Sequence, residues 1–146
     1  MIEEEINEIA EKLTNLLPLF TRSFMRPFQL QLKNVTSPLH LFAMQLLSEK
    51  ELSTLTELAY TMNMSKQQMT PIINKLHDNG FVLREQDNID RRSVNLKLTS
   101  VGIDFLQNIC KDINRNMVKK IKYLDGNDLH ALDQALDDLF RIIHKI

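Results

Sequence analysis

The sequence predicts one mainly α-helical domain that carries a single small β-hairpin. Only three glycines occur in 146 residues, so long stretches are free of the strongest helix breaker. Apolar residues recur three and four positions apart near both ends, which is the period of a helix with one apolar face. From Val94 onward apolar and polar residues alternate, which is the period of a strand with one buried face. The length suits one domain with its own core.

Each end of the chain is predicted to form an amphipathic helix. The apolar stripes are Ile6, Ile9, Leu13, Leu16 and Phe20 near the start, and Leu129, Leu132, Leu136, Leu139 and Ile143 near the end. Each stripe needs an apolar partner. Packing within the monomer and a bundle between copies through heptad-like seams both provide one. Pro18 and Pro27 predict a kink or break in the first helical region, because proline lacks a backbone donor.

Two short helices are predicted between residues 37 and 63. Ser37 and Pro38 resemble an N-cap followed by a first-turn proline, and this helix is expected to end near Glu49. Ser53 is predicted to cap the next helix, which Asn63 ends. Their apolar positions are Leu39, Phe42, Leu46 and Leu47 in the first helix, and Leu55, Leu58, Ala59 and Met62 in the second.

The stretch from residue 52 to residue 80 has the spacing of a helix-turn-helix. Ala59 is small where a second helix must approach, and Asn63 tolerates the left-handed backbone of a tight turn. Apolar positions continue through Met64, Met69 and Ile72. The methionines fill the gap between the helices, and a metal or apolar ligand is the alternative.

The second helix of this pair presents polar side chains at its start. Ser65 and Gln68 form a capping-box pattern that leaves Lys66 and Gln67 exposed in the first turn. A helix N-terminus attracts a phosphate, and short polar side chains there reach base edges in a major groove. The candidate DNA-binding residues are Ser65, Lys66, Gln67, Gln68, Thr70 and Asn74. An ordinary polar helix surface is the alternative interpretation.

A β-hairpin is predicted directly after this helix. Gly80 suits the helix end, residues 81–83 start an extended run, and Val94, Leu96 and Leu98 alternate with polar residues on the return strand. The connecting tip contains Asp90, Arg91 and Arg92. Arginines on a rigid arm are typical of side chains that enter a minor groove, and Asp90 would hold an arginine in place. A solvated turn with a surface ion pair is the alternative.

The order of elements and the string DRRSVNLKLTSVG resemble the MarR family of bacterial winged-helix regulators. Asp90, Arg92, Leu98, Thr99 and Gly102 match the wing pattern of the family. The resemblance implies a homodimer with recognition helices in successive major grooves and wings in the flanking minor grooves. It implies a single domain, residues 1–146, with dimerisation helices at about 1–34 and 103–146 and a winged helix-turn-helix lobe at about 37–102.

The resemblance also implies a function. We expect a dimeric regulator that binds double-stranded DNA at a pseudo-palindromic operator and acts as a repressor relieved by a small aromatic or lipophilic effector. Phe20, Phe24, Phe28, His40 and Phe42 are candidates for lining the effector pocket, although core packing explains the same residues. The sequence departs from the family at Pro71, inside the recognition helix, where relatives often carry a basic residue.

Charge and composition limit other functions. The formal net charge is −1, but residues 63–99 hold six basic and four acidic side chains, whereas both ends are acidic. The lone Cys110 and the acidic N-terminus favour a reducing cytoplasm, and no apolar run is long enough to span a membrane.

No cofactor or metal is expected, because the four histidines and Cys110 lack metal-binding spacing. No motif of an enzyme appears. Three alternatives remain: a helical, dimeric protein-interaction module without DNA binding, a redox-sensing regulator that uses Cys110, and an enzyme whose site is assembled from distant residues.

Overall fold

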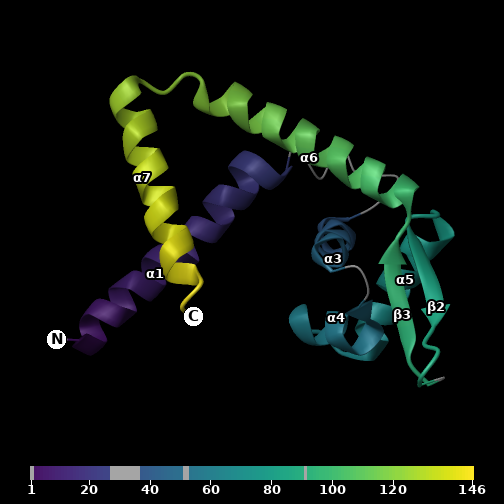
Figure 1. Cartoon of the computed structure of the whole chain (residues 1–146). Helices are drawn as coiled ribbons and strands as arrows, with labels where there is room; N and C mark the ends of the chain where they lie inside the picture. The colour runs from purple at the N-terminus through teal and green to yellow at the C-terminus, as the bar shows by residue number, and fades with distance from the viewer. Residues whose placement is uncertain (1, 27–36, 51–52, 91) are drawn as a thin grey trace. The chain divides into compact units, whose positions relative to one another are not determined.

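The computed structural model describes residues 2–26, 37–50, 53–90 and 92–146 (Figure 1). These residues form two compact units, Met1–Cys110 and Lys111–Ile146. The mainly helical fold with a small antiparallel sheet that the sequence predicts is confirmed. The assignment of the whole chain to a single domain stays a prediction.

The N-terminal helix is continuous through its first proline. Helix α1 (Ile2–Phe20) includes Pro18 and passes directly into a π-helical segment, η1 (Thr21–Met25). The break that was one of the two expected outcomes does not occur at Pro18, and the helix changes type three residues after the proline. Pro27 lies outside the described residues. Helix α1 buries no side chain, and its apolar stripe is exposed along its length.

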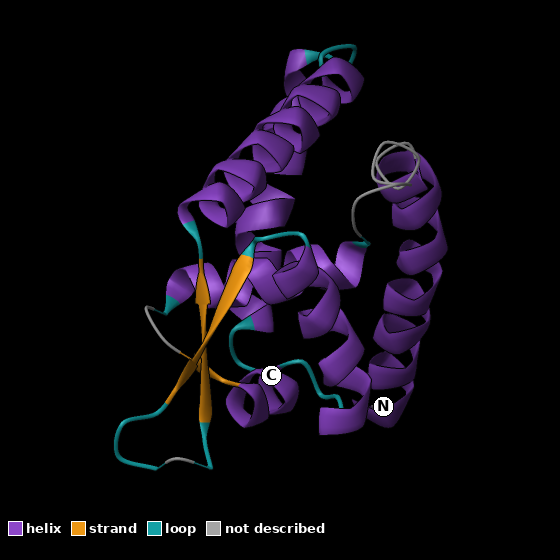
Figure 2. Cartoon of the chain, turned by 90° about the vertical axis from the view of Figure 1, so that its right-hand side faces the viewer, coloured by secondary structure: helices purple, strands orange, loops and turns teal. Residues whose placement is uncertain are grey.

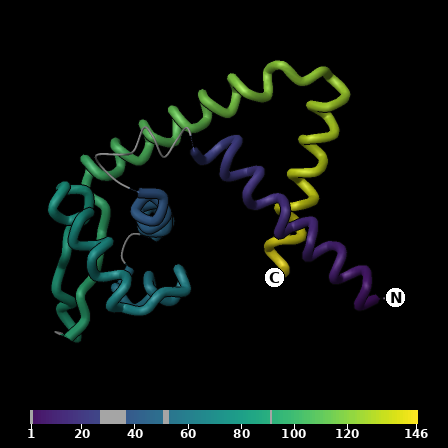
Figure 3. The backbone as a smooth tube through the Cα atoms, turned by 180° about the vertical axis from the view of Figure 1, so that it is seen from behind, coloured from purple at the N-terminus to yellow at the C-terminus, as the bar shows by residue number. Residues whose placement is uncertain are grey.

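A small lobe forms between residues 38 and 98. It comprises α3 (Pro38–Glu49), β1 (Ser53–Thr54), α4 (Leu55–Thr61), α5 (Lys66–Asp78), β2 (Val82–Gln86) and β3 (Val94–Leu98). The path of the chain through these elements is clear in Figure 3. Its core is apolar and includes Met44, Leu47, Leu58, Met69, Ile73, Leu76, Val82 and Leu96. Of the three methionines predicted to fill the gap between the helices, Met69 is fully buried, whereas Met62 and Met64 are half-buried.

The helix starts differ from prediction at two positions. Helix α4 is capped by Thr54 in a capping box with Glu57, and the predicted cap Ser53 instead lies in β1. The prediction was wrong by one residue because both side chains can cap. Ser37 does occupy the N-cap of α3, but its hydroxyl bonds to Nδ1 of His40, 2.5 Å away, and not to the backbone.

The three strands form an antiparallel sheet in the order β1-β3-β2. Val82 pairs with Leu98 and Arg84 with Leu96, and the hairpin extends as a twisted arm that ends in a loop (Figure 2). Leu96 and Leu98 are buried as the alternation predicts, whereas Val94 near the tip is 41% exposed. The arm therefore leaves the core before it turns.

The start of α6 (Ser100–Ile121) is fastened to the segment that follows α5. A Cβ atom on Gly102 would lie 2.3 Å from the carbonyl oxygen of Phe81, so only glycine fits. The hydroxyl of Thr99 accepts from the N–H of Gly102 at 2.9 Å. Rings of Phe81 and Phe105 stack with centroids 4.4 Å apart. These contacts give a physical reason for the Leu98-Thr99 and Gly102 pattern noted in the sequence.

The second unit contains the end of α6 and helix α7 (Gly126–Ile143). Asp125 caps α7 by accepting from the N–H of Asp128 at 2.8 Å. Helix α7 buries no residue, so its stripe of Leu129, Leu132 and Leu136 is also exposed. In the described part of the chain, no helix is long and apolar enough to cross a membrane.

Candidate nucleic-acid interface

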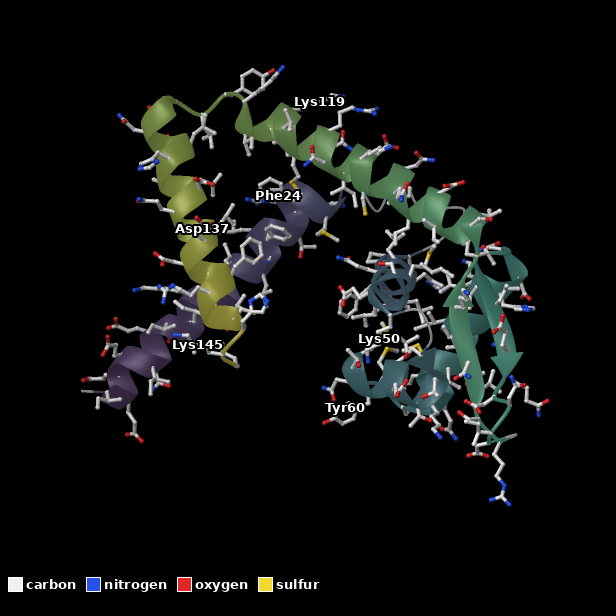
Figure 4. All side chains as sticks on the ribbon, in the orientation of Figure 1. Phe24, Lys50, Tyr60, Lys119, Asp137 and Lys145 are labelled. Carbon is white, nitrogen blue, oxygen red and sulfur yellow. The ribbon has the colours of Figure 1, made fainter. Side chains whose placement is uncertain are left out.

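The turn between α4 and α5 sets up the interface. Asn63 has φ 51°, the left-handed conformation that the sequence predicted for it. The N–H of Met64 donates to the carbonyl of Ala59 at 2.9 Å, which closes the turn. Tyr60 is 87% exposed beside this turn, where it is labelled in Figure 4. The pair of helices therefore has the tight connection of a helix-turn-helix.

The N-terminus of α5 is closed by the predicted capping box. The hydroxyl of Ser65 accepts from the N–H of Gln68 at 3.2 Å, and the side-chain oxygen of Gln68 accepts from the N–H of Ser65 at 3.0 Å. The box leaves Lys66 and Gln67 exposed in the first turn. It also uses one of the two lone pairs of the Gln68 amide oxygen and fixes the side chain, whose NH₂ group can still donate to a base.

One face of α5 stays in solvent while the other enters the core. Met69, Ile72, Ile73 and Leu76 are buried, whereas Lys66, Gln67, Thr70 and Asn74 are exposed. The hydroxyl of Thr70 donates to the carbonyl of Lys66 at 2.7 Å, so it keeps only acceptor capacity for DNA. Pro71 lies within the helix without ending it. Four of the six predicted DNA-binding residues therefore share one exposed face.

The loop of the wing is organised by Asp87. Its Oδ1 accepts from the N–H groups of Ile89 at 2.7 Å and Asp90 at 3.1 Å, and its Oδ2 accepts from the side-chain amide of Asn95 at 3.1 Å. The backbone N–H of Ile89 is the main cause that lowers the pKa of Asp87, followed by the N–H of Asp90 and the amide of Asn95. Because all three favour the carboxylate, Asp87 is charged at neutral pH and fixes the turn.

Asp90 and Arg92 lie together in this loop. Oδ1 of Asp90 accepts from the backbone N–H of Arg92 at 3.0 Å, so this contact orients the main chain that carries the arginine. The N–H of Ser93 donates to the carbonyl of Asp90 at 2.8 Å. Arg92 is exposed. Arg91 lies outside the described residues. Side chains project from the tip of the arm in Figure 4.

The wing and the recognition helix are joined by a side-chain hydrogen bond. Nη2 of Arg84 on β2 donates to Oδ1 of Asn74 on α5. Both side chains are exposed, so this bond lies on the surface of the lobe. Asn74 was predicted to contact DNA, and the structure adds that its amide oxygen already has a protein donor.

The proposed effector residues are placed as follows. Phe20 and Phe24 pack with ring centroids 5.1 Å apart. On α3, Phe42 is half exposed and His40 is partly buried. Burial, and next the charge of Lys75, lower the pKa of His40, which favours its neutral form. Phe28 lies outside the described residues. A role in ligand binding stays a prediction for this set.

No cluster of three or more His, Cys, Asp or Glu side chains that could hold a metal occurs within residues 2–26, 37–50, 53–90 and 92–146. Cys110 is a free, exposed thiol near the middle of α6. It is not the small buried hydrophobe that a lone helical cysteine often is. Exposure meets one requirement of the redox interpretation, which stays a prediction.

Three residues of this surface were not identified from the sequence: Arg84, Asp87 and Tyr60. Asp87 had a local signal, since an aspartate two residues before an N–H in a turn commonly accepts from it. The sequence signal for Arg84 was weaker. Arg84 lies on the same face of β2 as buried Val82, where the strand alternation predicts an apolar residue. For exposed Tyr60 there was no periodic signal.

Known proteins resemble this chain in sequence and in fold. Residues 37–94 match the MarR family. The HTH-type transcriptional regulator YkoM of Bacillus subtilis is 30% identical over 111 residues, which cover 73% of this chain and 70% of YkoM. The organic hydroperoxide resistance transcriptional regulator of the same species is 30% identical over 112 residues, with 77% and 74% covered.

A solved structure of a MarR family protein from Bacillus stearothermophilus has the same fold. It superposes with a TM-score of 0.78 at 19% identity, covering 94% of this chain and 97% of that one. The sequence match to curated transcriptional regulators extends over more than two thirds of this chain and of each relative. With the capped recognition helix and the wing in place, these matches show that the chain belongs to the MarR family of DNA-binding transcriptional regulators.

Proposed function

We propose that this regulator is a homodimeric repressor that binds a pseudo-palindromic operator and is released by a small aromatic or lipophilic effector. The observation that carries the DNA-binding part is the presence, in one lobe, of a capped helix with an exposed polar face and an arm tipped by Arg92. The helix suits a major groove and the arm suits a flanking minor groove.

Specific residues have distinct roles in this proposal. Lys66 and the N-terminus of α5 contact phosphate, which positions the protein, while Gln67 and the NH₂ group of Gln68 read base edges. Thr70 accepts from a base or a bound water. Ser65 acts through the capping box. In the wing, Arg92 and Arg91 enter the minor groove, and Asp90 orients the backbone at Arg92.

The terminal helices support dimerisation. Both α1 and α7 carry apolar stripes that no side chain within their own unit buries. Contiguous apolar stripes of this length are typical of helices that pack against another chain. A second copy would bury the same stripe on both partners through a two-fold axis. Two recognition helices related by this axis then fit a pseudo-palindrome.

Release by an effector is proposed from aromatic and histidine side chains. The paired rings of Phe20 and Phe24, with partly buried His40, offer apolar and hydrogen-bonding surface of the kind that small aromatic acids bind. An effector that binds the DNA-free dimer more tightly than the DNA-bound dimer would lower the affinity of the protein for its operator.

The test is binding to the DNA upstream of the chain's own gene, compared with random duplex, from 50 to 200 mM salt. We expect a steep loss of affinity with salt and a preference of at least about 1,000-fold for one sequence. Equal affinity for both duplexes would contradict the proposal. Absence of binding to either duplex would favour the alternative of a dimeric module that binds a protein and not DNA.

A further inference from the structure

Arg84 occupies an unusual position on the wing. Strand alternation places it on the same face of β2 as Val82, and the register pairs it with Leu96 on β3. Val82 and Leu96 are each 1% exposed, so this face belongs to the core. Arg84 is the next residue outward on that face and is exposed. It therefore lies where the apolar face of the sheet reaches solvent beside α5.

The guanidinium of Arg84 is directed at the recognition helix. Its Nη2 donates to Oδ1 of Asn74, which follows Lys66 by two helical turns and Thr70 by one. Asn74 thus belongs to the exposed stripe that includes the proposed DNA contacts. The hydrogen bond is a polar side-chain link between α5 and β2. It joins the two elements on the side that would face DNA.

We propose that Arg84 is a positioning residue for DNA binding, which acts through Asn74 to hold the wing at a fixed angle to the recognition helix. This inference rests on the proposed function. An exposed hydrogen bond contributes little to folding stability, so the effect of this one is on geometry. A small rotation of the sheet moves the distant wing tip by a larger amount. Fixing the angle before binding reduces the entropy lost when both elements dock.

The proposal also changes the role of Asn74. An asparagine reads adenine by using its oxygen as acceptor and its NH₂ as donor at the same time. Arg84 uses one of the two lone pairs of this oxygen and fixes the orientation of the amide, so Asn74 is not free to turn toward a base. Asn74 is therefore assigned to positioning, and sequence preference should come from residues nearer the start of α5.

A double-mutant cycle on the full-length protein tests the link. Arg84→Gln, Asn74→Ala and the double variant are compared with the parent for operator affinity across a salt series. We expect each single variant to bind about tenfold more weakly and the double variant to be within about threefold of either one, because one bond is lost in all three. The salt slope should stay at the parent value, since no phosphate contact is removed.

Lys97→Gln serves as the control for charge. Lys97 lies on the neighbouring strand, pairs with Leu83, and so belongs to the opposite face of the sheet. The substitution removes one positive charge from the same wing but leaves the hydrogen bond between Arg84 and Asn74 in place. The operator affinity of Lys97→Gln should therefore stay within about threefold of the parent value. Melting curves for all variants should coincide with that of the parent. Should Arg84→Gln unfold, Arg84→Met, which keeps an unbranched stem but has no donor, replaces it in the cycle.

A measurement without DNA examines geometry directly. Spin labels at Asn88→Cys on the wing and Asp78→Cys at the end of α5, in a Cys110→Ser background with excess unlabelled protein, report their separation. We expect Arg84→Gln and Asn74→Ala to broaden the distance distribution and Lys97→Gln to leave it unchanged.

Three results would overturn the inference. They are additive losses in the cycle, a salt slope reduced by about one for Arg84→Gln, which would indicate a direct phosphate contact, and parent-like binding by both single variants. These three binding results can be interpreted only if the parent protein prefers its operator over random duplex. If the parent shows no such preference, the proposed function is refuted, and the spin-label distances alone then test the role of Arg84.

Discussion

The hydroxyl of Thr99 donates a hydrogen bond of 2.6 Å to the carbonyl of Gly80, and so ties the start of α6 to the end of the recognition helix. The backbone N–H of Thr99 also donates to the carbonyl of Phe81 at 3.0 Å. Together with Gly102, which packs against the same carbonyl, these bonds join three elements at one point. The position of α5 in the lobe depends on this junction.

We predict that Thr99→Val destabilises the protein by about 1–3 kcal/mol, because the hydroxyl both donates to Gly80 and accepts from the N–H of Gly102. Thr99→Ser keeps the hydroxyl and should lose far less. Urea unfolding monitored by circular dichroism measures both. Equal stabilities for the two variants would contradict the assigned role of the hydroxyl.

Gln67 and Gln68 should respond differently to substitution. Gln68→Ala removes the capping-box oxygen and should lower the free energy of unfolding by about 1 kcal/mol, whereas Gln67→Ala should leave it unchanged. Gln67→Ala should instead reduce the preference for the operator over a variant with one altered base pair by about 1–3 kcal/mol. Thermal melts and competition binding separate the two effects. A stability loss in Gln67→Ala would show that it is not simply an exposed reader.

Arg92→Ala is expected to weaken operator binding by at least about tenfold while the melting temperature stays the same, because an exposed arginine contributes little to folding. The loss should be largest on A·T-rich flanks, where the minor groove is narrow and strongly negative. Affinities for operators with A·T-rich and G·C-rich flanks give the comparison, and Lys12→Ala on α1 controls for charge. Parent-like affinity in Arg92→Ala would leave the wing as a structural turn.

Leu136→Lys tests the apolar stripe of α7. Leu136 is 43% exposed in the single chain, and a two-fold interface would bury the Leu136 side chain of both protomers. Each buried leucine contributes about 1.5–3 kcal/mol, so the dimer dissociation constant should rise at least about 100-fold. Sedimentation velocity measures the change, with Asp137→Lys on the same helix as the control for added charge. A folded monomer at every concentration in the parent would rule out the dimer.

The Asp87 carboxylate predicts acid behaviour of the wing. Its pKa in the folded protein lies below the ordinary 3.8, so its contribution to wing order is fully present above about 3.8 and is lost as the pH falls through the lower folded value. Amide chemical shifts of Ile89 and Asp90 should therefore titrate with a midpoint below 3.8. In Asp87→Asn this transition should disappear. A midpoint above 3.8 would show that the carboxylate does not hold the turn.

Much of this surface was predictable because its signals are local. The capping box needs two residues three positions apart, the left-handed turn needs Asn63, and the hairpin needs only alternation. The cap of α4 was misplaced because Ser53 and Thr54 are adjacent and chemically alike; Glu57, three residues after Thr54, identifies the correct one.

The remaining features depend on contacts that sequence periodicity does not encode. The bond from Arg84 to Asn74 joins two exposed polar side chains on different elements, and either could equally have faced water. The change to a π-helix at Thr21 follows a proline that the helix tolerates, and no residue type marks such a change. The role of Asp87 depends on the turn that its own hydrogen bonds create.

The capping box of α5 limits how a phosphate can approach. Of the four N–H groups that open a helix, the box uses those of Ser65 and Gln68, which leaves the adjacent amides of Lys66 and Gln67. Two neighbouring amides suit a single anionic group. In the proposed complex the helix end would hold one backbone phosphate of one strand, and that contact would fix the rotational setting of the protein about the duplex axis. In a symmetric dimer, the distance between two such phosphates would determine which half-site spacings are accepted.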